Sequence, residues 1–187
     1  MSKEIDALEA EIAKDEGLTL EKYRRRNELW KEIEEELTKN SEDDKKVLKL
    51  FKEFVKEGFD PNHSNGWGFD IACSAGLYET VKYLLTLKSI DPTNDEYYGL
   101  REAIEGNKLN IVKIILKDKR VDPMALSGKL FRICIKYKRK GILIDLLKHP
   151  KTDIKELQRS SRLEGSPTFR EALKEMKLGS FQKFLNL

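Results

Sequence analysis

An Asp-Pro pair recurs in this sequence at a fixed interval, and much of the chain follows the same interval. Asp60-Pro61, Asp91-Pro92 and Asp122-Pro123 stand 31 residues apart, and Asp153 follows after a further 31. A period of this length is the signature of stacked repeats, in which each unit buries its apolar face against its neighbours. The spacing therefore predicts a repeat fold. The alternative is a plain helical bundle with an accidental period.

Apolar residues recur at the same interval between the Asp-Pro pairs. They fall at the spacing that places side chains on one face of a short helix, where neighbouring units would touch. The columns are Phe69, Leu100 and Phe131; Ala72, Ala103 and Cys134; Val81, Val112 and Leu143; Leu84, Ile115 and Leu146; and Leu85, Leu116 and Leu147. We expect these columns to form the core.

Each unit reads as a turn followed by two short helices. Proline restricts the residue before it and donates no amide hydrogen bond, so each Asp-Pro is expected in a turn or extended conformation. First helices are predicted over residues 69–75, 100–105 and 130–137. Gly76 and Asn107 follow two of them and suit the left-handed conformation that ends a helix. Lys138 holds this column in the third unit, where an irregular turn is expected.

The period divides the chain into an amino-terminal extension and a repeat domain. Residues 1–40 are expected to be a helical cap, with Thr19 capping its second helix and with Ile5, Leu8 and Ile12 on one face of its first. A coiled coil that makes a dimer is the alternative. The repeat domain, 41–187, is expected to comprise a degenerate first unit at 41–59, regular units at 60–90, 91–121 and 122–152, and an irregular capping unit at 153–187.

The end of the chain is apolar. Phe181, Phe184, Leu185 and Leu187 fall within its last seven residues. We expect this tail to fold back and close the last unit. The alternative is a peptide that docks on a partner.

The runs Ala72–Leu85 and Ala103–Leu116 resemble ankyrin repeats. More specifically, they resemble a compact variant with Asp-Pro between units that is common in large DNA viruses, phages and amoebae. The resemblance covers about half the chain and implies an all-α, ankyrin-like solenoid of about four helix-turn-helix units. The sequence departs from the Thr-Pro-Leu-His motif that usually opens an ankyrin repeat. In the first regular unit, Trp67-Gly68-Phe69-Asp70 stand in its place. The period is also shorter than the usual ~33 residues, which predicts trimmed finger loops rather than full hairpins.

The resemblance also implies where a partner would bind. Finger loops and first helices line the concave face of such stacks, and their exposed side chains vary from unit to unit. Carried over to this chain, the partner-binding positions are Trp67, Asp70, Ser74, Asp95, Glu96, Tyr97, Tyr98, Arg101, Glu105, Lys129, Arg132 and Lys136. Aromatic and arginine side chains suit a protein interface. The alternatives are loop-on-loop packing of Trp67 and Tyr98, and an ion pair between Asp70 and Arg101.

The resemblance therefore implies a non-catalytic module that binds another protein. Its viral and phage associations imply a host protein as the target, bound and inhibited. No phosphate-binding glycine loop, nucleophile elbow or histidine placed beside a cysteine or serine indicates an enzyme. Cys73 and Cys134 are too few and too far apart for a zinc site, so neither metal nor cofactor is expected. Cys134 stands in a column of alanines and is expected to be a small buried residue.

Charge is distributed unevenly along the chain. Residues 101–187 hold 21 Lys and Arg against 10 Asp and Glu, a net +11, whereas residues 1–100 hold 15 against 23, a net −8. Lys138, Arg139 and Lys140 are expected to form a basic patch. Such a patch is either a solvated turn or a contact for acidic protein or nucleic-acid phosphates, so nucleic-acid binding is the second functional hypothesis. Head-to-tail self-association is a further consequence of such a dipole.

Targeting signals are lacking in this sequence. No run approaches the ~20 apolar residues that span a membrane, and the first residues lack the apolar stretch of a secretory signal. We therefore expect a cytoplasmic protein, in the host cytoplasm if it is viral, without a membrane partner. The sequence leaves open whether the protein is a monomer or a dimer.

Overall fold

The structure is a computed structural model that describes residues 2–39, 43–159, 163 and 165–185, with side chains described from residue 4 to 176 within these ranges. Helices dominate, and the described part of the chain contains no strand. The prediction of an all-α protein is confirmed. The helical elements are α1 (Ser2–Asp15), α2 (Leu20–Thr38), α3 (Asp44–Lys56), η1 (His63–Gly66), α4 (Trp67–Ala75), α5 (Tyr78–Leu84), α6 (Asn94–Glu105), α7 (Leu109–Ile115), α8 (Ala125–Lys136), α9 (Lys140–Leu147), α10 (Ile154–Arg159) and α12 (Pro167–Leu185).

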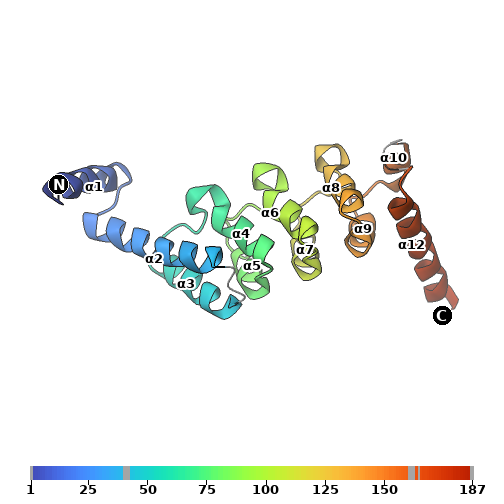
Figure 1. Cartoon of the computed structure of the whole chain (residues 1–187), viewed down its shortest axis with the longest axis horizontal. Helices are drawn as coiled ribbons and strands as arrows, with labels where there is room; N and C mark the ends of the chain where they lie inside the picture. Colours follow the sequence, from blue (N-terminus) through green and yellow to red (C-terminus); the bar gives the residue numbers. More distant parts are fainter. Residues whose placement is uncertain (1, 40–42, 160–162, 164, 186–187) are drawn as a thin grey trace.

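The helices stack in pairs along the long axis of the molecule (Figure 1). One helix of each pair lies in a first-helix row, in which α2, α4, α6 and α8 pack one on the next. The other lies in a second-helix row of α3, α5, α7 and α9. At the ends, α1 packs on α2 and α12 packs on α9. Helix α2, which we expected in the amino-terminal cap, therefore lies in the first-helix row and pairs with α3.

The core lies where the paired helices and their neighbours meet. Nearly all residues of the predicted apolar columns are buried, and Leu85 and Leu116 are half-buried. At the amino-terminal end, Trp30 of α2 adds a large aromatic side chain that contacts Phe51 and Phe54 of α3. A fully buried Leu, Ile or Phe contributes about 1.5–3 kcal/mol, so the columns account for why the pairs stack.

The aspartate of each Asp-Pro pair closes a short turn through its side chain. In all three turns, its Oδ1 atom accepts a hydrogen bond from the backbone amide two residues later, at 2.9 Å. The pairs are Asp60 with Asn62, Asp91 with Thr93, and Asp122 with Met124. This is the turn that aspartate favours through its short acceptor side chain. Asp153 differs, because it accepts from the amide of Glu156, three residues later, at 3.1 Å.

A left-handed turn follows each Asp-Pro turn. Residues 64–66, 95–97 and 126–128 all have φ between 44° and 81°, and the three runs stand 31 residues apart. Left-handed backbone costs roughly 1–2 kcal/mol for each non-glycine residue, so the packing on either side must hold these turns. The loops in this part of the chain form these compact turns, without hairpin strands.

The turn between the two helices of a pair has the same form in three pairs. Gly76, Asn107 and Lys138 all have positive φ, at 85°, 58° and 56°. The prediction of an irregular turn at Lys138 is therefore wrong. The backbone amide of the next residue, Arg139, donates a hydrogen bond to the Cys134 carbonyl of α8 at 2.7 Å. This bond helps to hold Lys138 in the left-handed conformation, which lysine alone does not favour.

Candidate functional site

The predicted partner-binding residues lie along the first-helix row and the loops that precede it (Figure 1). Their exposure divides them into three groups. Exposed are Asp95, Glu96, Tyr98 and Lys136; half-buried are Trp67, Ser74, Arg101, Glu105, Lys129 and Arg132; buried are Asp70 and Tyr97. The prediction that all of them are exposed is therefore wrong for Asp70 and Tyr97.

Asp70 faces the neighbouring pair instead of solvent. Only 9% of the residue is exposed, and the backbone amide of Gly99 donates a hydrogen bond to its carboxylate. Burial raises the pKa of Asp70 to about 7. The hydrogen bond from Gly99 acts in the opposite direction, but its effect on the pKa is smaller than that of burial. Arg101 does not pair with this carboxylate; its Nη2 atom donates to the Asp95 carbonyl at 3.3 Å. Asp70 therefore belongs to the junction between α4 and α6.

Tyr97 is buried, and it is the last residue of a left-handed turn, with φ at 63°. Its hydroxyl accepts a hydrogen bond from the Asp122 amide at 3.3 Å and so ties the loop before α6 to the following Asp-Pro turn. Trp67 is half-buried, with its ring centroid 6.4 Å from that of Trp30. Trp67 thus packs within the protein, as in the alternative of loop-on-loop packing. Its partner, however, is Trp30 of helix α2 and not a loop residue.

Exposed and half-buried side chains form a polar ridge over α6 and α8. We call it the loop ridge and define it as Asp95, Glu96, Tyr98, Arg101, Lys129 and Arg132. Glu96 and Lys129 form an ion pair across the two loops at 2.5 Å. The Arg101 guanidinium lies 5.3 Å from the centre of the Tyr98 ring. An exposed ion pair contributes at most about 1 kcal/mol, so these side chains can exchange internal contacts for contacts with a partner at little cost.

The predicted basic patch is divided by the structure. Lys138 is exposed, whereas Lys140 forms an ion pair with Glu175 of α12 at 3.1 Å. Arg139 turns inward, and its Nε atom donates to the Glu105 carbonyl at 3.1 Å. These three residues therefore do not present one continuous basic surface.

Arg139 belongs to a set of basic residues that bond backbone carbonyls of the preceding pair. Lys108 stands 31 residues before Arg139, and Lys151 stands 31 residues after Arg120. The hydrogen bonds run from Lys108 Nζ to the Ala75 carbonyl (3.1 Å), from Arg120 Nη1 to the Ile90 carbonyl (2.6 Å) and from Lys151 Nζ to the Val121 carbonyl (2.9 Å). These contacts were not predicted from the sequence, although the basic residues share the interval of the repeat.

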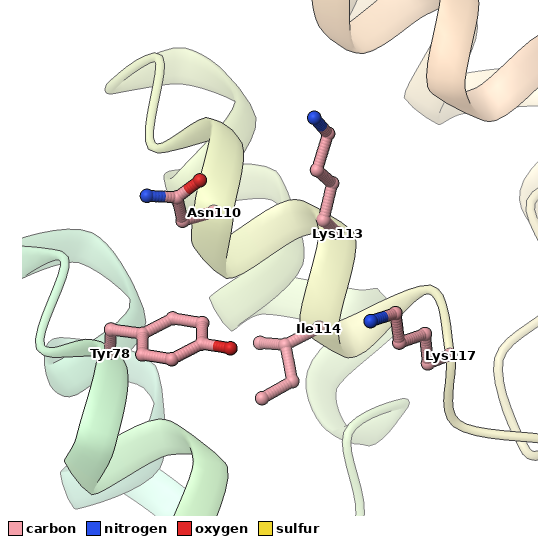
Figure 2. Close-up of a pocket in the computed structure, with 5 residues that line it drawn as sticks. All are labelled: Tyr78, Asn110, Lys113, Ile114 and Lys117. Atoms are coloured by element: carbon pink, nitrogen blue, oxygen red, sulfur yellow. The ribbon is translucent and has the colours of Figure 1, made fainter.

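A hollow of about 300 Å³ lies on the second-helix row between α5 and α7. Figure 2 shows that the Tyr78 side chain reaches from α5 with its hydroxyl toward Ile114 of α7. Asn110, Lys113 and Lys117 complete the lining. The hollow thus combines an apolar wall with cationic and amide groups. The sequence analysis did not single out any of these residues.

Both cysteines are buried and form no disulfide. Burial raises the pKa of Cys134 to about 12, so its thiol is protonated at neutral pH. The prediction that Cys134 is a small buried residue is confirmed. Within the described residues, no cluster of three or more His, Cys, Asp or Glu side chains could hold a metal ion.

None of the helices that the structure describes has both the length and the apolar character needed to cross a membrane. Comparisons with protein-family models, with curated proteins and with solved structures gave no match to this chain.

Proposed function

We propose that this chain is an ankyrin-like solenoid that binds another protein and does not catalyse a reaction. One observation carries the proposal: the loops repeat one backbone but carry different exposed side chains. Asn65, Glu96 and Ser127 occupy equivalent left-handed positions, with φ at 55°, 54° and 51°. A constant frame with variable side chains suits recognition, because each pair adds one distinct contact to an extended surface.

The way the helices pack supports the solenoid part of the proposal. In both rows, each helix packs on those of the adjacent pairs, and the pairs stack along a single axis (Figure 1). The Asp-Pro turns and the carbonyl contacts of Lys108, Arg120 and Lys151 recur between pairs. Nearest-neighbour stabilisation of this kind is characteristic of solenoids.

The loop ridge is the surface that we assign to the partner. It offers an exposed aromatic ring, an arginine and charges of both signs, which are side chains that supply contact area and directed hydrogen bonds in interfaces. Tyr98 is 37% exposed, so part of its side chain is available to a partner.

The proposal is tested by capturing partners with the tagged protein at low and high salt, with and without nuclease. The ridge variant Glu96→Ala/Tyr98→Ala should lose a partner that wild type retains at high salt. The control Tyr78→Ala/Glu79→Ala removes the same residue types from the second-helix row and should retain it. Equal recovery by the ridge variant would exclude the loop ridge as the binding surface.

Nucleic-acid binding is the second candidate, favoured by exposed lysines on the second-helix row and in the turns that follow its helices. These are Lys82, Lys113, Lys117, Lys119 and Lys148. Affinity from phosphate contacts falls steeply as salt rises. Measuring duplex and single-strand binding by fluorescence anisotropy at several salt concentrations tests this candidate; an affinity insensitive to salt would exclude it.

A further inference from the structure

Large apolar side chains are exposed mainly at two separate places in the described part of the chain. The first is α1, and the second is the second-helix row. Those on α1 are Ile5 (55% exposed), Leu8 (58%) and Ile12 (36%). Those on the second-helix row are Tyr78 (37%), which lines the hollow between α5 and α7, and Leu109 (36%) of α7. Exposed apolar groups that gather in this way mark interaction sites.

Helix α1 is held to α2 by a face other than its apolar stripe. Arg24 of α2 forms ion pairs with Asp6 and with Glu9, the latter at 2.8 Å, and Ala13 is buried. Arg26 of α2 pairs with Glu16. The stripe of Ile5, Leu8 and Ile12 lies beside this anchored face and remains exposed.

Acidic residues border the stripe on its outer side. Glu11 and Asp15 each follow an apolar residue of the stripe by three positions, so they are its neighbours on the helix surface. Both are exposed. The free surface of α1 is therefore an apolar stripe beside a line of carboxylates.

The hollow on the second-helix row has the complementary character. Tyr78 of α5 and Ile114 of α7 are the apolar side chains that line the hollow. Lys82, Lys113 and Lys117 are exposed around these apolar side chains. Figure 2 shows Lys113 directed away from the apolar wall, which leaves Ile114 accessible beside the Tyr78 ring.

We infer that α1 of one copy of this protein docks in the hollow between α5 and α7 of a second copy. The stripe from Ile5 to Ile12 covers about 10 Å at 1.5 Å per residue, and packed helices lie about 8–10 Å apart. The stripe can thus contact Tyr78 of α5 and Ile114 of α7 together. Glu11 and Asp15 beside the stripe then meet Lys113 and Lys117 of the hollow, so the charges are complementary. Apolar docking of a helix in a groove, oriented by charge, is a common recognition mode.

The contact joins two different surfaces of the chain, so it is head-to-tail. Helix α1 lies at one end of the stack, whereas α5 and α7 lie further along it (Figure 1). Each copy therefore keeps one unoccupied surface after a single contact. Repetition of such a contact builds open chains unless the rotation between copies closes a ring.

Sedimentation velocity and light scattering across a wide range of protein concentration test the inference. Wild type should grow in mass with concentration, and less so at high salt. The α1 variant Leu8→Glu and the hollow variant Lys113→Glu/Lys117→Glu should each remain monomeric alone. Mixed in equal amounts, they should form a 1:1 dimer and nothing larger, because only one intact α1 and one intact hollow remain.

Two further variants serve as controls. Lys45→Glu/Lys49→Glu places the same charge change at the same spacing on exposed positions of α3, and it should associate as wild type does. If the double lysine variant fails to give the helical circular dichroism of wild type, Tyr78→Glu blocks the hollow independently.

Three results would overturn the inference. The first is wild type that stays monomeric throughout, and the second is a mixture of the α1 and hollow variants that forms no dimer. The third is a hollow variant that associates as well as wild type while Leu8→Glu does not, which would indicate pairing of α1 with α1.

Discussion

The carboxylate of Asp70 accepts a hydrogen bond from the backbone amide of Gly99, across the junction between α4 and α6. A methyl group at position 99 would come within 2.7 Å of the Asp70 Oδ1 atom, so only glycine allows this approach. Burial of the carboxyl favours its protonated form and raises its pKa from 3.8 to about 7. One junction of the stack therefore contains a group that titrates near neutrality.

Replacing this carboxyl with an amide should stabilise the protein at alkaline pH. The folded state holds the Asp70 proton more tightly than the unfolded state does, so this residue's stabilising contribution is full below about pH 4 and is lost as pH rises through 7. Asp70→Asn should therefore exceed wild type in unfolding free energy by on the order of 2 kcal/mol at pH 8, and by much less near pH 4. Urea unfolding of both proteins across this range measures the difference. The exposed Asp15→Asn should show no such trend, and a flat difference for Asp70→Asn would contradict the raised pKa.

Removing an Asp-Pro carboxylate should destabilise the stack moderately. Asp91 Oδ1 accepts from the Thr93 amide at 2.9 Å and from the Thr93 hydroxyl at 2.8 Å. Asp91→Ala loses both bonds and should lower the unfolding free energy by about 1–2 kcal/mol. Asp91→Asn keeps a side-chain oxygen acceptor and should lie closer to wild type. Equal midpoints of urea unfolding for Asp91→Ala and wild type would show that the turn does not need the Asp91 side chain.

Helix α5 depends on a carboxylate from the preceding pair. Asp44 accepts hydrogen bonds from the amides of Glu79 (2.7 Å) and Thr80 (2.9 Å) and from the Thr80 hydroxyl (2.7 Å). Thr80 is fully buried, so Asp44→Ala leaves polar groups unsatisfied and should cost about 2–3 kcal/mol. Asp44→Asn keeps one acceptor and should fall between Ala and wild type in thermal unfolding. An Ala variant as stable as the Asn variant would mean that water replaces Asp44.

Lys138→Gly should stabilise the protein. Lys138 has φ at 56° in the position that glycine holds in an earlier pair, at Gly76. Glycine adopts this conformation without the cost of roughly 1–2 kcal/mol that a side chain incurs. Glycine also has greater freedom in the unfolded chain, which offsets part of this saving, so the unfolding free energy should rise by about 1 kcal/mol. Differential scanning calorimetry measures the change. Lys136→Gly, at the last residue of α8, should instead destabilise, because lysine favours a helix more than glycine does. A loss of stability on Lys138→Gly would show that the lysine side chain outweighs the backbone strain.

Much of the architecture was predictable from the sequence because its determinants are local. The apolar columns lie at helical spacing, and their burial follows from that spacing alone. Thr19 caps α2 through its side chain, accepting from the Lys22 amide at 3.2 Å, as predicted. The tail residue Leu187 lies outside the described residues, and the side chains of Phe181, Phe184 and Leu185 are likewise not described.

The candidate site was less predictable, because exposure depends on the neighbouring pair. Asp70 and Tyr97 are both polar residues near a loop, yet the junctions with α6 and with the Asp122 turn bury them. The inward turn of Arg139 likewise depends on a carbonyl of the preceding pair.

By itself, the sequence determined the period, the helical character, the buried columns and the positions of the turns, since each follows from residue spacing and local backbone preference. Only the tertiary structure decided which polar side chains face solvent, that α2 lies in the first-helix row, and that Tyr78 and Lys117 border one hollow. The physical reason is that side chains 31 or more residues apart meet only when the helices stack. The direction and distance of that meeting are fixed by packing between neighbouring pairs, which no local pattern specifies.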